Sequence, residues 1–181
     1  MTIRRGSLRA ACAAASFLLL AGCGFLSPGT GITPTLMTVS SEAFVGSVLP
    51  ATFTCHTRLP ISPPVGWSGA PANTKSYALV VDDSSAPITP YIYWIVYNIS
   101  PASSDIEQGL LPPGARQAVN SAGTARYDPP CPRGGPHKYR FTVYALSSML
   151  NLPEGATLSD AWNAIAAASI DYGRIPVTAN P

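Results

Sequence analysis

The sequence predicts a mainly β domain: an antiparallel, sandwich-like fold with one α-helix near its C-terminus. Short β-type segments alternate with Pro and Gly clusters, one segment is apolar at nearly every residue, and a single stretch has apolar residues at helical spacing. With 19 prolines, 15 glycines and 46% hydrophobic residues, the chain has the composition of a compact, turn-rich domain with enough apolar surface for a core.

Five segments have a β-type composition between turn signals: Leu36 to Val39, Ala51 to Cys55, Ser76 to Val81, Tyr91 to Ile99 and Tyr139 to Leu146. The segment from Tyr91 to Ile99 should lie centrally, because a strand that is apolar throughout is covered on both faces. The segment from Tyr139 to Leu146 alternates more, as expected for a strand with a less buried face.

One helix is expected from about Leu158 to Ser169. Thr157 and Asp160 form a start that is similar to a capping box, in which a side-chain oxygen accepts a backbone N–H of the first turn. The apolar residues that follow recur three to four positions apart, which gives one apolar face to pack on the β core.

The N-terminus has the pattern of an export signal. Arg4, Arg5 and Arg9 precede an apolar run from Ala10 to Ala21, and this run is shorter than the roughly 20 residues that a membrane-spanning helix needs. Residues 1–22 are therefore predicted to be a cleaved signal peptide. Export could follow either the general or the twin-arginine route.

Leu20-Ala21-Gly22-Cys23 resembles the bacterial lipobox, in which the cysteine is acylated before cleavage. An ordinary secretory signal that happens to contain a cysteine is the alternative. With lipidation, residues 23–35 are a Gly, Ser, Thr and Pro-rich tether, residues 36–181 are one domain, and the protein is held at the extracytoplasmic face of the cell membrane.

The charge balance argues against nucleic acid as a partner. After removal of the signal, the chain has eight basic and nine acidic residues, so that its net charge is near −1. A nucleic-acid-binding protein would have a basic stripe, which this sequence lacks. No motif in the sequence calls for a cofactor or a metal ion.

Two of the four cysteines, Cys55 and Cys131, remain for the exported domain once Cys12 and Cys23 are assigned to the signal and the lipid. A disulfide between them suits an oxidising compartment. Two separate buried thiols are the alternative, because the sequence cannot show that the two Cα atoms come within bridging distance.

Two loops contain most of the polar groups that could bind a ligand. The first, residues 82–87, follows an apolar strand with two adjacent carboxylates, which either cap a turn or face a pocket. The second, residues 127–136, is stiffened by prolines, and after it His137 and Tyr139 fall on one face of the next strand. His56 is expected to be a surface residue without a role.

In four blocks the sequence resembles the phosphatidylethanolamine-binding protein family, also called Raf-kinase-inhibitor-like proteins, in its bacterial branch. The blocks are residues 53–71, the Asp-Asp-Ser-Ser-Ala-Pro loop with the strand to Ile99, Asn120-Ser121, and residues 127–146. The resemblance implies antiparallel sheets and a cavity that accepts phosphate, phosphorylated head groups or similar anions. The ligand-binding residues that it implies are Asp83, Ser85, Pro87, Tyr93, Pro130, Pro132, His137 and Tyr139.

Two of these positions depart from the family pattern. Ser85 replaces the second Asp of the family motif, which reduces repulsion of an anion, and Tyr93 replaces a His, which leaves only a phenol donor. The resemblance therefore predicts anion binding at His137 with an altered affinity or ligand preference. His137 could instead be a core histidine satisfied by a carboxylate such as Asp83.

Two other functions remain as alternatives. One is a surface lipoprotein that binds another protein, such as a protease. The other is a hydrolase that uses Asp83, Ser85 and His137, but Gly66-Trp67-Ser68-Gly69 is followed by Ala70 where a nucleophile elbow has its second Gly. The protein is therefore expected to be a binding protein rather than an enzyme.

Overall fold

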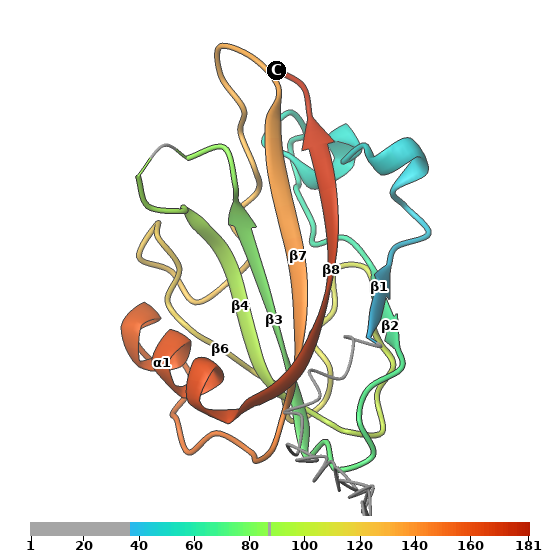
Figure 1. Cartoon of the computed structure of the whole chain (residues 1–181). Helices are drawn as coiled ribbons and strands as arrows, with labels where there is room; N and C mark the ends of the chain where they lie inside the picture. The colour runs from blue at the N-terminus through green and yellow to red at the C-terminus, as the bar shows by residue number, and fades with distance from the viewer. Residues whose placement is uncertain (1–36, 87) are drawn as a thin grey trace, which may run out of the picture. The chain divides into compact units, whose positions relative to one another are not determined.

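A computed structural model describes residues 37–86 and 88–181, in which two antiparallel sheets and one α-helix form the domain (Figure 1). The mainly β fold with a C-terminal helix is confirmed. The predicted signal peptide, Cys23 and the tether lie outside the described residues, as does Pro87. Within the described ranges, no helix is both long enough and apolar enough to cross a membrane.

The larger sheet has five strands in the order β6-β4-β3-β7-β8. In chain order they are β3 (Ser76–Asp83), β4 (Ile92–Ile99), β6 (Arg116–Gln117), β7 (His137–Leu146) and β8 (Ser169–Ala179). Strand β3 is central and buried at every residue, and β4 is buried at seven of its eight, as predicted for a strand covered on both faces.

The smaller sheet has three strands in the order β1-β2-β5: β1 (Thr38–Ser40), β2 (Val65–Ser68) and β5 (Asp105–Ile106). Two short 3₁₀ helices, η1 (Val45–Ser47) and η2 (Ala51–Phe53), connect β1 to β2. Because β2 pairs with both β1 and β5, it is the middle strand of this layer.

Side chains alternate between two apolar layers along the central strands. Leu79 and Val81 of β3 join Phe141 of β7 in the core between the sheets. Ala78 and Val80 point the other way and pack with residues of helix α1 (Leu158–Ala168). The large sheet thus separates one core, shared with the small sheet, from a second core under α1.

Helix α1 begins as predicted, because the Thr157 hydroxyl accepts the amide N–H of Asp160 at 3.1 Å. The helix ends at Ala168, and Ser169 starts β8 directly. The sequence analysis did not predict β8, whose Asp171, Gly173 and Pro176 are poor strand formers. Since β8 is the last strand of the sheet in its pairing order, a proline is tolerated there.

The strand predicted from Ala51 to Cys55 is wrong, since Ala51–Phe53 forms η2. Its turns are closed by hydrogen bonds from Phe53 N to Pro50 O and from Thr54 N to Ala51 O, each 3.0 Å long. The Thr54 hydroxyl also donates to Ala51 O at 2.9 Å. Local side-chain bonding of this kind competes with strand formation, and apolar composition alone does not reveal it.

The first and last strands of the described domain lie against each other (Figure 1). A Cβ atom at Gly173 of β8 would lie 2.7 Å from the Met37 carbonyl oxygen, so only glycine permits this approach. Farther along β8, the Leu49 amide donates to Thr178 O at 2.9 Å. These contacts join the small sheet to the edge of the large one.

Candidate functional site

A histidine and a carboxylate pair at one end of the large sheet, where β3 ends and β7 begins. Asp83 lies opposite Tyr139 in the β3–β7 register, and His137 is two residues earlier on the same face of β7. The distance between His137 Nδ1 and Asp83 Oδ2 is 2.8 Å. The Asp83 side chain is 6% exposed and that of His137 is 33% exposed. The carboxylate is therefore buried, and its histidine partner is in contact with solvent.

The loop after β3 fixes the carboxylate. The Ser85 amide donates to Asp83 Oδ1 at 2.7 Å, and the Lys138 amide donates to Ser85 Oγ at 2.8 Å. The Ser84 amide donates to Lys138 O at 2.8 Å. Ser85, predicted as a ligand-binding residue, thus ties its own loop to β7.

A β-bulge in β4 brings Tyr93 to the same cluster. Val81 pairs with Trp94 and Asp82 with Ile92, so one residue of β4 has no partner in β3. Tyr93 and Trp94 consequently both pack against the core between the sheets. Bulges often redirect a side chain near a functional site, and here the Tyr93 ring comes to 5.4 Å from the Tyr139 ring, edge-on.

The Tyr139 hydroxyl is buried and forms no hydrogen bond of good geometry among the described residues, although the Tyr93 phenol lies close enough to lower the pKa of Tyr139 as a hydrogen-bond partner. Tyr139 is fully buried, and burial, followed by the negative charge of Asp83, raises the pKa of its phenol to about 12. Burial, followed by the influence of Tyr139, also raises the pKa of Tyr93. Both phenols therefore remain neutral donors at physiological pH.

Tyr91 and Asp128 extend the cluster, and the sequence analysis assigned no role to either. The Tyr91 hydroxyl donates to Asp128 Oδ2 at 2.9 Å, and the Tyr91 and Tyr93 ring centroids are 4.6 Å apart. Burial and the bond to Asp128 raise the pKa of Tyr91 to about 12. The place of Asp128 in the Pro-rich loop of residues 127–136 was the only signal in the sequence.

The loop before β7 is fixed by the predicted disulfide. Cys55 and Cys131 are bonded, with their Cα atoms 5.2 Å apart, and the Cys55 amide donates to Pro130 O at 3.0 Å. Pro130 and Pro132 are buried. The Pro130 carbonyl accepts its hydrogen bond from the Cys55 amide and not from a residue of the His137 cluster. The disulfide thereby attaches the loop to the segment that follows η2.

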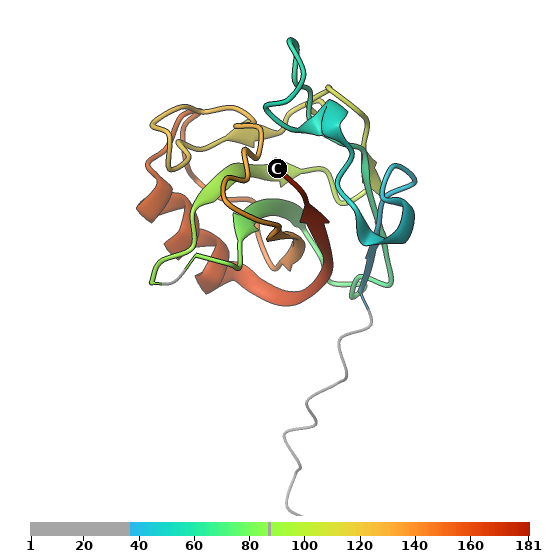
Figure 2. The same cartoon turned by 90° about the horizontal axis from the view of Figure 1, so that it is seen from above.

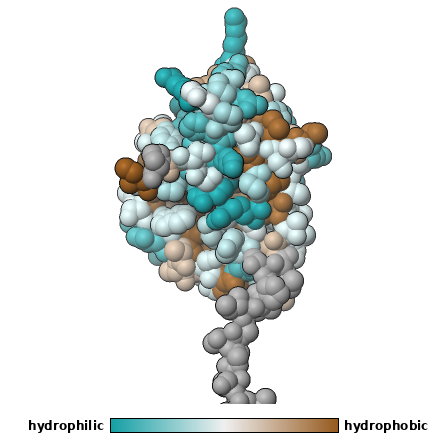
Figure 3. Space-filling model, turned by 45° about the horizontal axis from the view of Figure 1, so that its top comes forward, coloured by the Kyte–Doolittle hydropathy of each residue, from teal (hydrophilic) through white to brown (hydrophobic). Residues whose placement is uncertain are grey.

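The end of the domain that contains this cluster has a largely hydrophilic surface. Seen from above, the loop before β7 lies beside the C-terminus, consistent with the pairing of His137 and Ala179 (Figure 2). With this end turned forward, hydrophilic residues cover the middle of the face, and apolar ones form separate spots (Figure 3). In residues 37–86 and 88–181, no group of three or more metal-ligating side chains comes together.

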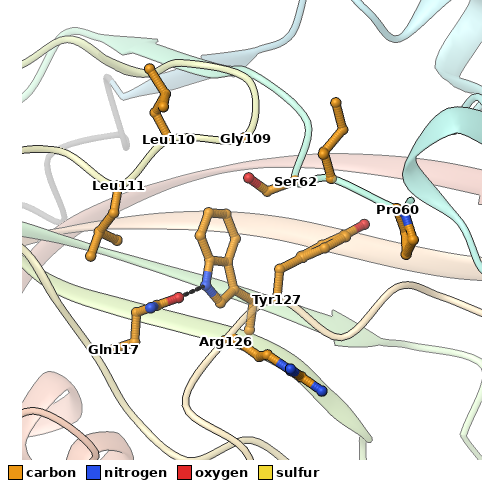
Figure 4. A pocket seen from close by; sticks show the side chains of 10 residues that line it. Pro60, Ser62, Gly109, Leu110, Leu111, Gln117, Arg126 and Tyr127 are labelled. Carbon is orange, nitrogen blue, oxygen red and sulfur yellow. Dashed lines mark hydrogen bonds between the residues drawn. The ribbon is translucent and has the colours of Figure 1, made fainter.

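A separate hollow of about 260 Å³ is lined by Trp94 and nine other residues, and His137 is not one of them (Figure 4). Its walls include Leu110, Leu111 and Tyr127, and Gln117 Oε1 accepts the Trp94 indole N–H at 2.7 Å. The Tyr127 hydroxyl donates to Phe53 O at 2.6 Å. These indole and phenol donors already have partners, and Arg126 and Ser62 are further polar side chains that line the hollow.

The fold has counterparts in known proteins. The family described as phosphatidylethanolamine-binding protein matches residues 39–180. The chain therefore belongs to this family, as the resemblance predicted.

The relatives of this chain include two proteins that are 40% identical to it. A UPF0098 protein of Methanothermobacter thermautotrophicus is 40% identical over 122 residues, which cover 65% of this chain and 80% of the relative. A Mycobacterium tuberculosis protein named "Putative lipoprotein LppC" is 40% identical over 142 residues, 77% of this chain and 70% of the relative.

The solved structures confirm the fold. The phosphatidylethanolamine-binding protein homologue CT736 of Chlamydia trachomatis has a TM-score of 0.72 at 35% identity, covering 80% of this chain and 97% of its own. YbcL of Escherichia coli, described as a member of the mammalian PEBP family, has a TM-score of 0.74 at 27% identity, covering 81% of this chain and 99% of its own.

Proposed function

We propose that this protein is an extracytoplasmic lipoprotein whose domain binds a small phosphorylated anion, such as a phospholipid head group, beside His137. The observation that supports the proposal is the buried Tyr139 hydroxyl, which forms no hydrogen bond of good geometry in residues 37–86 and 88–181, next to the His137–Asp83 pair. A buried donor without a partner costs about 1 to 3 kcal/mol, and an anion oxygen would remove this cost.

The Asp83 contact determines how His137 can act. With Nδ1 bonded to the carboxylate, the imidazole is held in one orientation, and Nε2 is the nitrogen left to face a ligand. Neutral imidazole with its proton on Nδ1 offers an anion only a lone pair at Nε2. Protonated imidazole offers a charged donor, which Asp83 stabilises, so anion binding should be coupled to proton uptake.

Anchoring through Cys23 rests on the lipobox-like sequence and on the relative named a lipoprotein. Two or three acyl chains hold a protein stably, whereas a single chain binds only marginally. An anchored domain would meet phospholipid head groups at high local concentration, which suits a site of modest affinity.

Binding rather than turnover is proposed because of the contacts of Ser85. Its Oγ accepts the Lys138 amide, and within the described residues no hydrogen bond joins Ser85 to His137. A serine nucleophile needs an adjacent base to take its proton, and in the described residues the hydrogen bond of Ser85 Oγ is to the Lys138 amide rather than to His137. The seryl hydroxyl is instead used to position the loop.

Titration calorimetry with sn-glycero-3-phosphoethanolamine tests the proposal. This diester keeps its charge across the range in which histidine titrates, whereas a phosphate monoester changes charge near pH 6, about where histidine does. We expect affinity to rise as the pH is lowered from about 8 to about 5.5. His137→Ala should abolish this pH dependence, and His56→Ala, at the exposed second histidine, should preserve it.

Inorganic phosphate and phosphoethanolamine serve as further ligands in the same titration. Absence of heat with all three would remove the anion site and favour the alternative of a protein-binding surface. A pH dependence that survives His137→Ala would remove His137 from the proposed role, even if an anion binds.

A further inference from the structure

A second cavity lies on the opposite face of the large sheet, between its β3–β7 end and helix α1. Its volume is about 370 Å³, at the small end of the range for ligand sites. Neighbouring residues of a strand point to opposite faces, so Asp82 and Arg140 line this cavity while Asp83 and Tyr139 belong to the His137 cluster. The lining residues are Asp82, Thr89, Pro90, Ile92, Ser121, Arg140, Leu158 and Trp162.

One wall of the cavity is apolar and includes an exposed tryptophan. Trp162 of α1 is 42% exposed and packs edge-on against Tyr144, with ring centroids 6.4 Å apart. Pro90, Ile92 and Leu158 complete this wall. An indole fixed in this way offers a flat face to an apolar ligand.

The polar end of the cavity is an ion pair. Arg140 Nε lies 3.1 Å from Asp82 Oδ1 and 3.0 Å from Oδ2, and Arg140 Nη2 also bonds Oδ2. Asp82 is buried, so both of its oxygens are used inside the protein. The hydrogen bonds of Arg140 to Asp82 use Nε and Nη2, so in the described part of the chain the two N–H groups of Nη1 remain as charged donors of a residue that lines the cavity.

The other polar groups also offer donors. Ser121 Oγ accepts the Ile92 amide at 2.9 Å, so its hydrogen remains for another acceptor. Thr89 is exposed and adds a second hydroxyl. With the Asp82 oxygens occupied, a ligand here needs an acceptor as its polar group. Because Asp82 already offsets the Arg140 charge, a single negative charge suits the cavity better than two.

We infer that this cavity is a second binding site, whose ligand is a small monocarboxylate with an aromatic or branched aliphatic body. The carboxylate bonds Arg140 Nη1 and the Ser121 hydroxyl, and the apolar body packs on Trp162 and Leu158. The site does not depend on the anion site at His137, from which the large sheet separates it.

The inference is tested with 3-phenylpropionate as the probe, by tryptophan fluorescence and calorimetry. The other two tryptophans, Trp67 and Trp94, are 6% and 2% exposed, but Trp94 also lines the separate hollow, so a change in emission is assigned to Trp162 when it disappears in Trp162→Ala. A ligand of this size should saturate the site with a dissociation constant on the order of 1 mM. The matched alcohol, 3-phenylpropan-1-ol, should bind at least about tenfold more weakly, since it cannot accept charge-assisted bonds from Arg140.

Three variants locate the probe, each first shown to unfold at a temperature close to that of the wild type. By calorimetry, Trp162→Ala should weaken binding at least about tenfold, because it removes the apolar wall at an exposed position. Arg140→Lys keeps the charge opposite Asp82 but removes the planar fork, and should weaken binding about tenfold. His137→Ala, on the other face, should leave the affinity unchanged.

Four results would overturn the inference: no saturation up to about 20 mM probe, equal affinity for the alcohol, wild-type affinity in Trp162→Ala or Arg140→Lys, or loss of binding in His137→Ala. The last result would place the probe at the His137 cluster instead.

Discussion

Asp82 and Asp83 are neighbours in β3, yet they bond to different partners on opposite faces of the large sheet. Asp83 pairs with His137 on the side of the small sheet, and Asp82 pairs with Arg140 on the side of α1. Strand alternation thus gives one short motif two separate electrostatic environments. The two carboxylates can therefore be changed independently.

The Asp82–Arg140 pair should be strongly coupled. Asp82→Asn leaves the Arg140 guanidinium without its counter-charge, and we expect it to lower the free energy of unfolding by about 1 to 3 kcal/mol. This is less than for a fully buried pair, because the Arg140 side chain is 29% exposed. Combined with Arg140→Met, the loss should be smaller than the sum of the two single losses. Urea denaturation of the four proteins in this cycle measures the coupling, and simple additivity would contradict it.

Tyr139→Phe separates stability from binding. It removes a buried hydroxyl that forms no hydrogen bond of good geometry among the described residues, so the free energy of unfolding should stay the same or rise by about 1 kcal/mol. Affinity for phosphate should fall about tenfold, because a donor to the anion is lost. Denaturation and calorimetry on the same samples check both. A large loss of stability would show that the hydroxyl already has a partner in the folded protein.

The disulfide should contribute to both stability and binding. It joins cysteines 76 residues apart, and we expect the double substitution Cys55→Ala/Cys131→Ala to cost about 2 to 5 kcal/mol. Because Cys131 is in the loop before β7, anion affinity should fall as well. Chemical denaturation with and without reductant gives the first value. The matched control is the double variant itself, which should not respond to reductant.

The tyrosine cluster predicts a loss of stability in alkali. The folded protein raises the pKa of Tyr91 and of Tyr139 from 10 to about 12, so it holds these protons more tightly than the unfolded chain. Their contribution to stability is complete below pH 10 and is lost as the pH rises toward 12. Thermal unfolding measured across this range should show the loss, and Tyr91→Phe should reduce it. A flat profile above pH 10 would contradict the assignment.

Lipidation at Cys23 predicts a change of location. In the host, Cys23→Ala should block acylation and release the mature domain from membranes, because the remaining interactions with lipid are weak. Fractionation and intact-mass measurement would detect the missing acyl groups. Complete membrane partitioning of Cys23→Ala, with normal processing, would contradict the proposal.

Much of the fold could be predicted because β3, β4, β7 and α1 have strong local patterns. Their apolar runs, or in α1 a helical period with a Thr157 cap, match their burial in the structure. Strand β8 could not be predicted this way, since its stability comes from pairing with β7 rather than from its own residues. Similarly, Pro50 and the Thr54 hydroxyl turn the Ala51 segment into η2.

Most residues of the candidate site could be predicted from the sequence, but the hydrogen bonds and ring contacts between them could not. Family resemblance pointed to Asp83, His137 and Tyr139, which the sheet register brings together. The bulge that turns Tyr93 toward Tyr139 and the Tyr91–Asp128 bond depend on strand pairing that the sequence does not reveal. Ser85 matched a ligand position, yet its hydroxyl accepts the Lys138 amide.

The contact between Met37 and Gly173 has a consequence for how the protein is made. A ribosome synthesises β1 early and β8 last, yet β8 supplies the edge against which β1 packs. Until β8 is complete, β7 lacks one of its two neighbouring strands and the small sheet lacks its contact with the large one. Closure of the domain therefore waits until β8 has been synthesised, and loss of this strand would leave two unpaired edges open to aggregation.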